Sequence, residues 1–156
     1  MGSRVKTQAT ITVRPLEVDD LPKVQDIDHK STGRFRAPTY DDPLSACLGG
    51  DLGLSYVAEI NGEVVGFIFG WLMDSFWLYH EGARIEMVGV DPVHRQRGVG
   101  RHLLEAFLRG CREKGVREVH VLVHNHDPEF KAFLGKSSFQ PAELVDYVCQ
   151  TSTQAV

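Results

Sequence analysis

An amphipathic helix stands between two strand-like runs in the second half of the chain, and this order constrains the fold more than any other feature. Its apolar residues recur at helical spacing over residues 99–111, and Gly115 follows as a helix-ending residue. The preceding run (83–91) is rich in β-forming residues, and the following run (116–123) alternates apolar and polar positions. A strand, a helix and a strand in succession favour an α/β or α+β domain with a mixed sheet.

The rest of the chain supplies further strands and helices for that sheet. Asn61-Gly62 joins two strand-like runs and is the strongest short signal for a hairpin, because both positions of such a turn need positive φ. Pro22 falls in the first turn of a helix whose N-cap is Asp19 or Asp20. The other expected elements are strands at 11–14, 54–60, 63–72, around Phe139 and at 144–151, and helices at 43–48 and 127–136.

Composition limits the class of protein. The 156 residues carry 17 Lys and Arg against 21 Asp and Glu, a formal net charge of −4, which argues against a general nucleic-acid binder. No apolar run approaches the roughly 18 residues of a membrane span and no export signal is present, so we expect no membrane partner and a cytoplasmic location. The three scattered cysteines fit reduced thiols. One domain over 1–156 is expected, with loose ends at about 1–9 and 151–156.

Basic residues gather in the turn between the 83–91 run and the amphipathic helix. A helix N-terminus presents unpaired N–H groups and the positive end of the helix dipole, which suit a phosphate. Gly98 and Gly100 allow close backbone approach, while Arg95, Arg97 and Arg101 add charge with a geometry that matches phosphate. The turn is therefore a predicted anion site. It lacks both the Gly-Lys-Ser/Thr of a Walker loop and the third glycine of a dinucleotide-binding fingerprint.

This turn resembles the signature of a known family. The string Arg95-x-x-Gly98-x-Gly100, after a strand that ends in Val-Asp-Pro, is similar to the acyl-CoA signature of the GNAT superfamily of N-acyltransferases, Gln/Arg-x-x-Gly-x-Gly/Ala. Residues 133–139, Phe-Leu-Gly-Lys-Ser-Ser-Phe, resemble the family's distal Phe-Tyr-x-Lys-x-Gly-Phe. The resemblance covers nearly the whole chain. It implies a central mixed, mostly antiparallel sheet of 6–7 strands, splayed between the fourth and fifth strands, with about four helices on both faces.

The resemblance also implies acetyl-CoA as the cosubstrate and indicates the backbone that would hold it. Amides of the basic turn would bind the pyrophosphate, and the edge of the preceding strand would pair with the two amides of the pantetheine arm. Asp127 occupies a place where the family often has Asn or Asp, near the cofactor or substrate. The implied cofactor-binding residues are Met87, Val88, Gly89, Val90, Arg95, Gln96, Arg97, Gly98, Val99, Gly100, Arg101 and Asp127.

Two side chains are candidates for the base that deprotonates an acceptor amine. Glu86 lies on the strand beside the expected thioester, where the family often carries a glutamate, and burial between apolar neighbours would make it a stronger base. A structural or substrate-orienting role for this carboxylate, with ordered water as the base, is an equal alternative. His124, at the end of the neighbouring strand, is the second candidate because imidazole exchanges protons near neutral pH.

The sequence offers neither a complete set of metal ligands nor the proton donor that is usual in the family. His120, His124 and His126 share one strand parity, but no carboxylate or cysteine completes a ligand set, so no metal is expected. The usual acid of the family is a tyrosine, and Leu134 stands in its place. The candidate replacements are Tyr79, Tyr147 and Cys149.

The function implied by the resemblance is N-acetyl transfer from acetyl-CoA to a primary amine, of a small molecule or a peptide, directly within a ternary complex. Because of Leu134, the alternative is a non-catalytic acyl-CoA-binding sensor or interaction module. Binding of a nucleotide phosphate is a third option. Aromatic and polar loop residues would line an acceptor pocket or, equally, a contact in a homodimer: Phe35, Tyr40, Phe76, Trp77, Tyr79 and His80.

Overall fold

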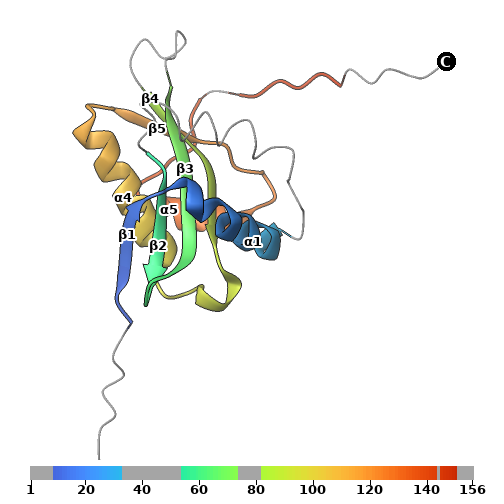
Figure 1. The fold of residues 1–156 in the computed structure, drawn as a ribbon. Coiled ribbons are helices and arrows are strands. Elements are labelled where there is room, and N and C mark those ends of the chain that lie inside the picture. Colours follow the sequence, from blue (N-terminus) through green and yellow to red (C-terminus); the bar gives the residue numbers. More distant parts are fainter. Residues whose placement is uncertain (1–8, 33–53, 74–81, 144, 151–156) are drawn as a thin grey trace, which may run out of the picture. The chain divides into compact units, whose positions relative to one another are not determined.

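A mixed sheet forms the centre of the computed structural model, which describes residues 9–32, 54–73, 82–143 and 145–150. The chain divides into two compact units, residues 1–122 and 123–156. In the described part of the first unit, five strands lie side by side in chain order (Figure 1). They are β1 (Ile11–Pro15), β2 (Tyr56–Ile60), β3 (Glu63–Met73), β4 (Gly82–Val90) and β5 (Glu118–Val121).

The hairpin signal and the β-α-β signal both place strands correctly. Asn61 and Gly62 adopt φ of 53° and 79° between β2 and β3, so both take the left-handed conformation that the turn needs. Neighbouring strands from β1 to β4 are antiparallel, whereas β4 and β5 are parallel and joined through helix α4 (Val99–Glu113). The expected mixed, mostly antiparallel sheet is confirmed.

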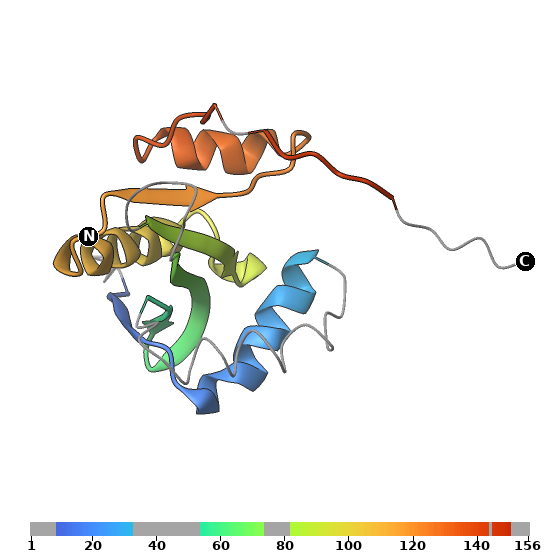
Figure 2. The same cartoon turned by 90° about the horizontal axis from the view of Figure 1, so that it is seen from above.

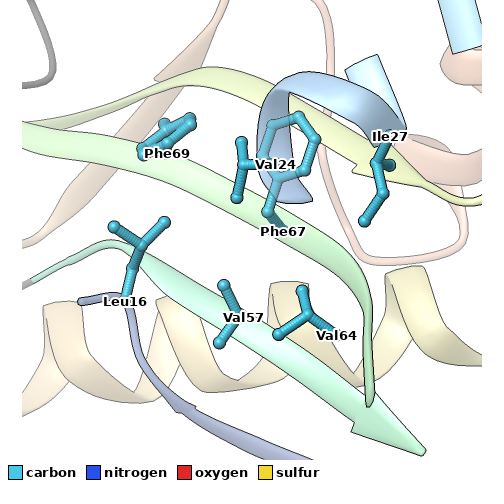
Figure 3. Packing of buried hydrophobic residues seen from close by; sticks show 7 residues of the cluster. All are labelled: Leu16, Val24, Ile27, Val57, Val64, Phe67 and Phe69. Carbon is cyan, nitrogen blue, oxygen red and sulfur yellow. The ribbon is translucent and has the colours of Figure 1, made fainter. Parts of the chain in front are cut away.

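Helices α1 (Leu21–Thr32) and α4 cover opposite faces of the sheet (Figure 2). Pro22 lies in the first turn of α1, which follows a short 3₁₀ turn, η1 (Val18–Asp20). On the α1 face, buried apolar side chains from α1, β2, β3 and the segment after β1 pack together (Figure 3). They are Leu16, Val24, Ile27, Val57, Val64, Phe67 and Phe69.

On the other face, two glycines of β3 bring α4 close to the sheet. A Cβ added at Gly66 would lie 2.9 Å from Val99 Cγ1, and one at Gly70 would lie 2.6 Å from Phe107 Cζ. Real Cβ atoms do not tolerate such contacts, so the α4 backbone can sit at this depth only because both side chains are absent. The start of α4, and the basic turn before it, is thereby fixed against β3.

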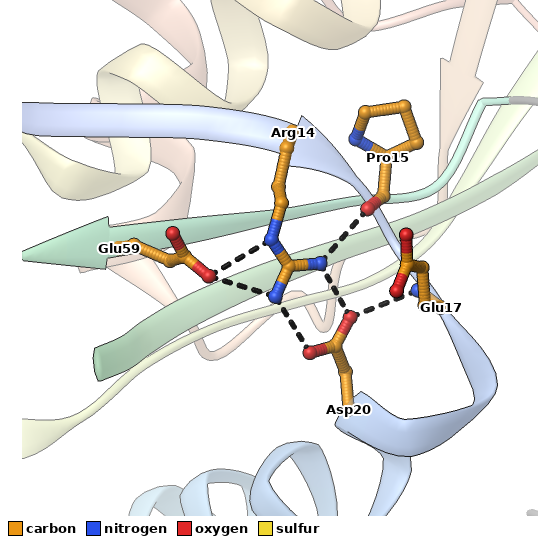
Figure 4. Close-up of polar contacts among 5 residues, drawn as sticks. All are labelled: Arg14, Pro15, Glu17, Asp20 and Glu59. Carbon is orange, nitrogen blue, oxygen red and sulfur yellow. Dashed lines mark hydrogen bonds and ion pairs between the residues drawn. The ribbon is translucent and has the colours of Figure 1, made fainter. Parts of the chain in front are cut away.

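An arginine ties β1 to its neighbours on the way into α1 (Figure 4). The Arg14 guanidinium donates to both oxygens of Asp20 at 2.7 and 2.8 Å, and its Nε donates to Glu59 of β2 at 2.8 Å. Asp20 also accepts the Glu17 N–H at 2.8 Å. The Arg14 guanidinium holds the pKa of Asp20 below its usual range, because it stabilises the ionised carboxylate. This network orients the chain where β1 leads into α1.

Two of the expected strands are wrong. Phe139 donates its N–H to the Leu134 carbonyl at 3.2 Å and Ser138 has φ of 65°, so this stretch closes the end of helix α5 (Pro128–Gly135). Residues 145–150 contain no strand, and Val145, Tyr147 and Val148 are 72%, 92% and 74% exposed. A strand requires a partner edge, and these residues have none in the described chain.

The strand and helix counts therefore differ from the expectation of six to seven strands and about four helices. The described residues form five strands and three α-helices, with η1 and a second 3₁₀ turn, η2 (Pro92–His94). The helix expected at 43–48 and the loose ends expected at about 1–9 and 151–156 fall wholly or almost wholly outside the described residues. None of the helices in the described part of the chain is long and apolar enough to cross a membrane.

Candidate active site

The pairing between β4 and β5 ends halfway along β4. Their parallel pairing runs from Gly82 opposite Glu118 to Ile85 opposite Val121, whereas β4 continues to Val90. On its other edge β4 stays paired with β3 as far as Val90. Among the described residues no strand pairs with the β5 side of β4 beyond Ile85. The predicted backbone 87–90 therefore lies along an open sheet edge, which can pair with an extended ligand.

A β-bulge at Glu86 marks the start of this opening. Met87 pairs with Phe69 and Ile85 pairs with Gly70, so Glu86 is an extra residue in β4. A bulge bends its strand and increases the local twist, which accounts for β4 turning away from β5 at this position. The predicted burial of Glu86 is wrong: its side chain is exposed, and Oε2 lies 3.2 Å from Arg84 Nε. The bulge turns Glu86 outward, so it is a solvent-accessible carboxylate paired with a cation.

The open edge leads directly into the basic turn, which a buried aspartate organises. Asp91 accepts the N–H of Val93 at 3.1 Å, and its own N–H donates to the Val65 carbonyl of β3 at 2.8 Å. The end of α1 adds two contacts, since Ser31 Oγ donates to the Val90 carbonyl at 3.3 Å and Lys30 Nζ lies 3.6 Å from Asp91. The turn is thus anchored to both β3 and α1.

The turn presents unpaired backbone donors together with positive charge. Gln96 and Gly98 have φ of 60° and 85°, and α4 begins immediately after Gly98. Gly98 offers no side chain to cap the helix, so the first N–H groups of α4 have no side-chain acceptor there. The predicted arginines of the turn, Arg95, Arg97 and Arg101, are all exposed. Uncapped amides, the helix dipole and three cations make this an anion-binding arrangement.

The sequence-predicted residues of the open edge and the basic turn fall in one continuous stretch of the first unit. Gly89 has a packing role as well, because a Cβ there would lie 2.7 Å from Phe67 Cζ. Val99 is buried against β3, so only its backbone is available to a ligand. This segment joins an open sheet edge to the basic start of a helix, and the binding roles of its residues stay predictions.

The remaining predicted residues belong to the second unit. β5 ends at Val121, so the expectation that His124 closes this strand is wrong; His124 is exposed and its carbonyl accepts the Asp127 N–H at 3.0 Å. Asp127 is the N-cap of α5, accepting the Phe130 N–H at 2.9 Å. Leu134 is a buried residue of the same helix.

The candidate replacements for a tyrosine acid and the aromatic loop residues are not gathered into a site by the described residues. Tyr147 and Cys149 are exposed. Tyr79, like all the other aromatic loop residues named above, lies outside the described residues. In the described ranges no three His, Cys, Asp or Glu side chains come together as metal ligands would.

Sequence reasoning missed Arg84, and it considered His120 only as a possible metal ligand; both lie beside the point where β4 and β5 separate. Arg84 contacts Glu86, and His120 is the parallel-sheet partner of Arg84. Alternation along the two strand-like runs would have placed each on the polar face of its strand, but only the register brings them together.

Comparison with known proteins identifies the family. The model of the acetyltransferase (GNAT) family matches residues 20–136, so the chain belongs to that family. An uncharacterized N-acetyltransferase of Methanocaldococcus jannaschii is 27% identical over 146 residues, which cover 87% of this chain and 63% of the relative. This chain therefore spans less than two thirds of that relative's length.

Solved structures share the fold. Ard1 from Thermoplasma volcanium superposes with a TM-score of 0.71 and 29% identity, over 83% of this chain and 82% of that one. The aminoglycoside N-acetyltransferase AAC(6')-Iy, solved in complex with CoA, gives a TM-score of 0.76 over 95% of this chain and 99% of that one. At 19% identity the second likeness concerns the fold alone.

Proposed function

We propose that the protein transfers the acetyl group of acetyl-CoA to a primary amine of a small molecule or a peptide. The transfer is direct, within a ternary complex of protein, acetyl-CoA and amine. The observation that carries the proposal is the continuity of the open β4 edge with the uncapped, basic start of α4. CoA combines an extended chain containing amides with a pyrophosphate. The two parts match the two halves of this surface.

The residues that would hold CoA divide between backbone and side chain. Amides of the turn from Arg95 to Arg101 would bind the pyrophosphate, and the arginines would add charge-assisted contacts to its oxygens. The backbone of Met87 to Val90 would pair with the pantetheine arm. Asp127 stays a proposed contact on the basis of the family motif alone. No metal is part of this proposal.

Glu86 is the residue that we propose acts on the acceptor amine. An ammonium has no lone pair, so it must lose a proton before it attacks the thioester. An exposed carboxylate can attract the ammonium and pass the proton to water, and Arg84 Nε lies 3.2 Å from its Oε2. This arrangement favours Glu86 as an orienting group or a relay through water over a buried base. His124 is the alternative base, and water itself is the third.

The experiment measures both binding and turnover. Isothermal titration calorimetry tests acetyl-CoA binding, and release of free CoA is followed against a panel of small amines and peptides. Binding with turnover of one class supports the proposal. Binding without turnover throughout the panel contradicts it and supports the sensor that Leu134 suggests. Stabilisation by ATP but not by CoA would instead support a nucleotide site.

A matched pair of variants tests the role of Glu86. Glu86→Gln is expected to lower kcat/KM by about 100-fold or more while acetyl-CoA affinity is retained. Glu113→Gln removes an exposed carboxylate at the far end of α4 and is expected to leave both unchanged. Equal activity of the two variants would remove Glu86 from the mechanism.

A further inference from the structure

A row of three half-buried side chains crosses the sheet beside the point where β4 and β5 part. Trp71 on β3 pairs with Arg84 on β4, and Arg84 pairs with His120 on β5. Ile85 pairs with Gly70, the position that α4 approaches, so Ile85 faces α4. Because side chains alternate along a strand, the neighbouring Arg84 and its partner His120 face the other side of the sheet.

Each positive or titratable member of this row has a carboxylate two residues away on its own strand. Arg84 Nε lies 3.2 Å from Glu86 Oε2, and His120 Nε2 lies 3.4 Å from Glu118 Oε2. Both nitrogen atoms are inaccessible to solvent. Neither nitrogen makes a hydrogen bond within the described residues, so each carboxylate acts on its partner through charge at close range, and the arginine and the imidazole stand next to each other across β4 and β5.

His120 stands one residue before the last paired position of β5. It is the only histidine on the two strands that border the gap, and both strands are fully described. Imidazole can hold and release a proton near neutral pH, whereas the guanidinium of Arg84 keeps its proton. Of the side chains in the row, His120 is thus the one suited to proton transfer.

We propose that His120 protonates the sulfur of CoA as it leaves, with Glu118 as a positioning residue that orients the ring; this rests on the proposed function. Leu134 cannot donate a proton, so the role is open. When the tetrahedral adduct collapses, the C–S bond breaks and its electron pair stays on sulfur. The imidazolium Nδ1–H gives its proton to that sulfur, so CoA leaves as a thiol and His120 is left neutral. The ring then takes up a proton from water, which has received the proton of the amine.

The test uses CoA itself, so it does not depend on the identity of the amine. An imidazolium within reach of a thiol lowers the pKa of that thiol. We expect the pKa of the bound CoA thiol, followed by the ultraviolet absorbance of the thiolate, to lie about one unit or more below that of free CoA. His120→Gln is expected to abolish this difference while CoA still binds. His126→Gln, which removes an exposed histidine of the second unit, is the matched control and retains it.

The charged groups around His120 determine which further variants the experiment needs. Arg84 on β4 is its partner across the sheet, Glu118 on β5 lies 3.4 Å from its Nε2, and Glu86 contacts Arg84. A low thiol pKa that persists in His120→Gln but disappears in Arg84→Gln would overturn the inference and assign the effect to the guanidinium. Glu118→Gln is expected to reduce the shift in part, and it also covers the case in which His120→Gln fails to fold. An unchanged shift in Glu118→Gln would overturn the orienting role.

Failure of the inference and failure of the proposed function give different results. If CoA does not bind the unsubstituted protein, both fall. If CoA binds and its thiol titrates as it does in solution, the inference about His120 falls and the proposed function stands.

Discussion

Two glycines at opposite ends of α4 allow a sharp test of the anion site. Gly98 precedes the helix with φ of 85°, and Gly115 follows it with φ of 74°. Both therefore need the left-handed conformation, which costs an L-residue about 1–2 kcal/mol. A Cβ at Gly98 would approach no atom closer than His102 Nδ1 at 3.7 Å, and one at Gly115 would meet nothing within 4 Å. Alanine at either position thus introduces backbone strain without a steric clash.

The two alanine variants are expected to lose similar stability but to differ in CoA binding. A loss of about 1 kcal/mol corresponds to a fall in Tm of about 2–4 °C for a chain of this size. Gly98→Ala also places a methyl group beside the uncapped amides of α4. Loss of one amide–phosphate hydrogen bond costs about 1.5–3 kcal/mol, or roughly a 10- to 150-fold weaker Kd. Gly115→Ala is expected to leave the Kd unchanged.

Calorimetric titration with CoA, together with thermal unfolding of each variant, separates the two effects. CoA affinity that is unchanged in both Gly98→Ala and Gly115→Ala would refute the placement of the pyrophosphate at this turn. Equal weakening in both variants would show that strain in α4, and not the methyl group at its start, controls binding.

Three further changes test the fold around the site. Asp20→Asn is expected to lower the free energy of unfolding, measured in urea, by about 1–3 kcal/mol. Because the folded pKa of Asp20 is lowered, this contribution is present above about pH 4 and is lost as the pH falls further. A difference in urea midpoint between the unsubstituted protein and Asp20→Asn that stays constant between about pH 6 and 2 would contradict this. Gly70→Ala would put a Cβ 2.6 Å from Phe107 Cζ of α4 and 2.6 Å from the Arg84 carbonyl, so a loss of about 2 kcal/mol or more is expected, and an unshifted denaturation curve would refute this close packing. Burial raises the pKa of Cys111 to about 11, so it should react with iodoacetamide at pH 8 far more slowly than the exposed Cys149, as peptide mass spectrometry would show.

Local signals in the sequence predicted the elements whose geometry depends on a few neighbouring residues. The Asn61-Gly62 turn needs positive φ at both positions, and few other dipeptides accept it. The apolar spacing behind α4 defines one buried face, and Gly98 with its arginines marks the start of that helix. The placement of the candidate anion site therefore required only the strand, the turn and the helix.

Features that depend on pairing between distant strands were missed. The exposure of Glu86 follows from a bulge opposite Phe69 and Gly70, and apolar neighbours in sequence do not reveal a bulge. His120 was considered only with other histidines of its own run, whereas its partner across the sheet is Arg84. Alternation in the last segment resembles a strand, yet a strand forms only where a free edge accepts it.

The close packing of α4 against Gly66 has a consequence for the energetics of ligand binding. Since the start of α4 and the turn before it are held by β3, by α1 and by the Asp91 cap, a ligand that binds there orders little additional backbone. Fixing one residue's backbone costs about 1–2 kcal/mol, so a turn that is already formed spares that entropy for each of its residues. Backbone NMR order parameters of the turn should consequently be high before CoA is added, and CoA should change them only modestly.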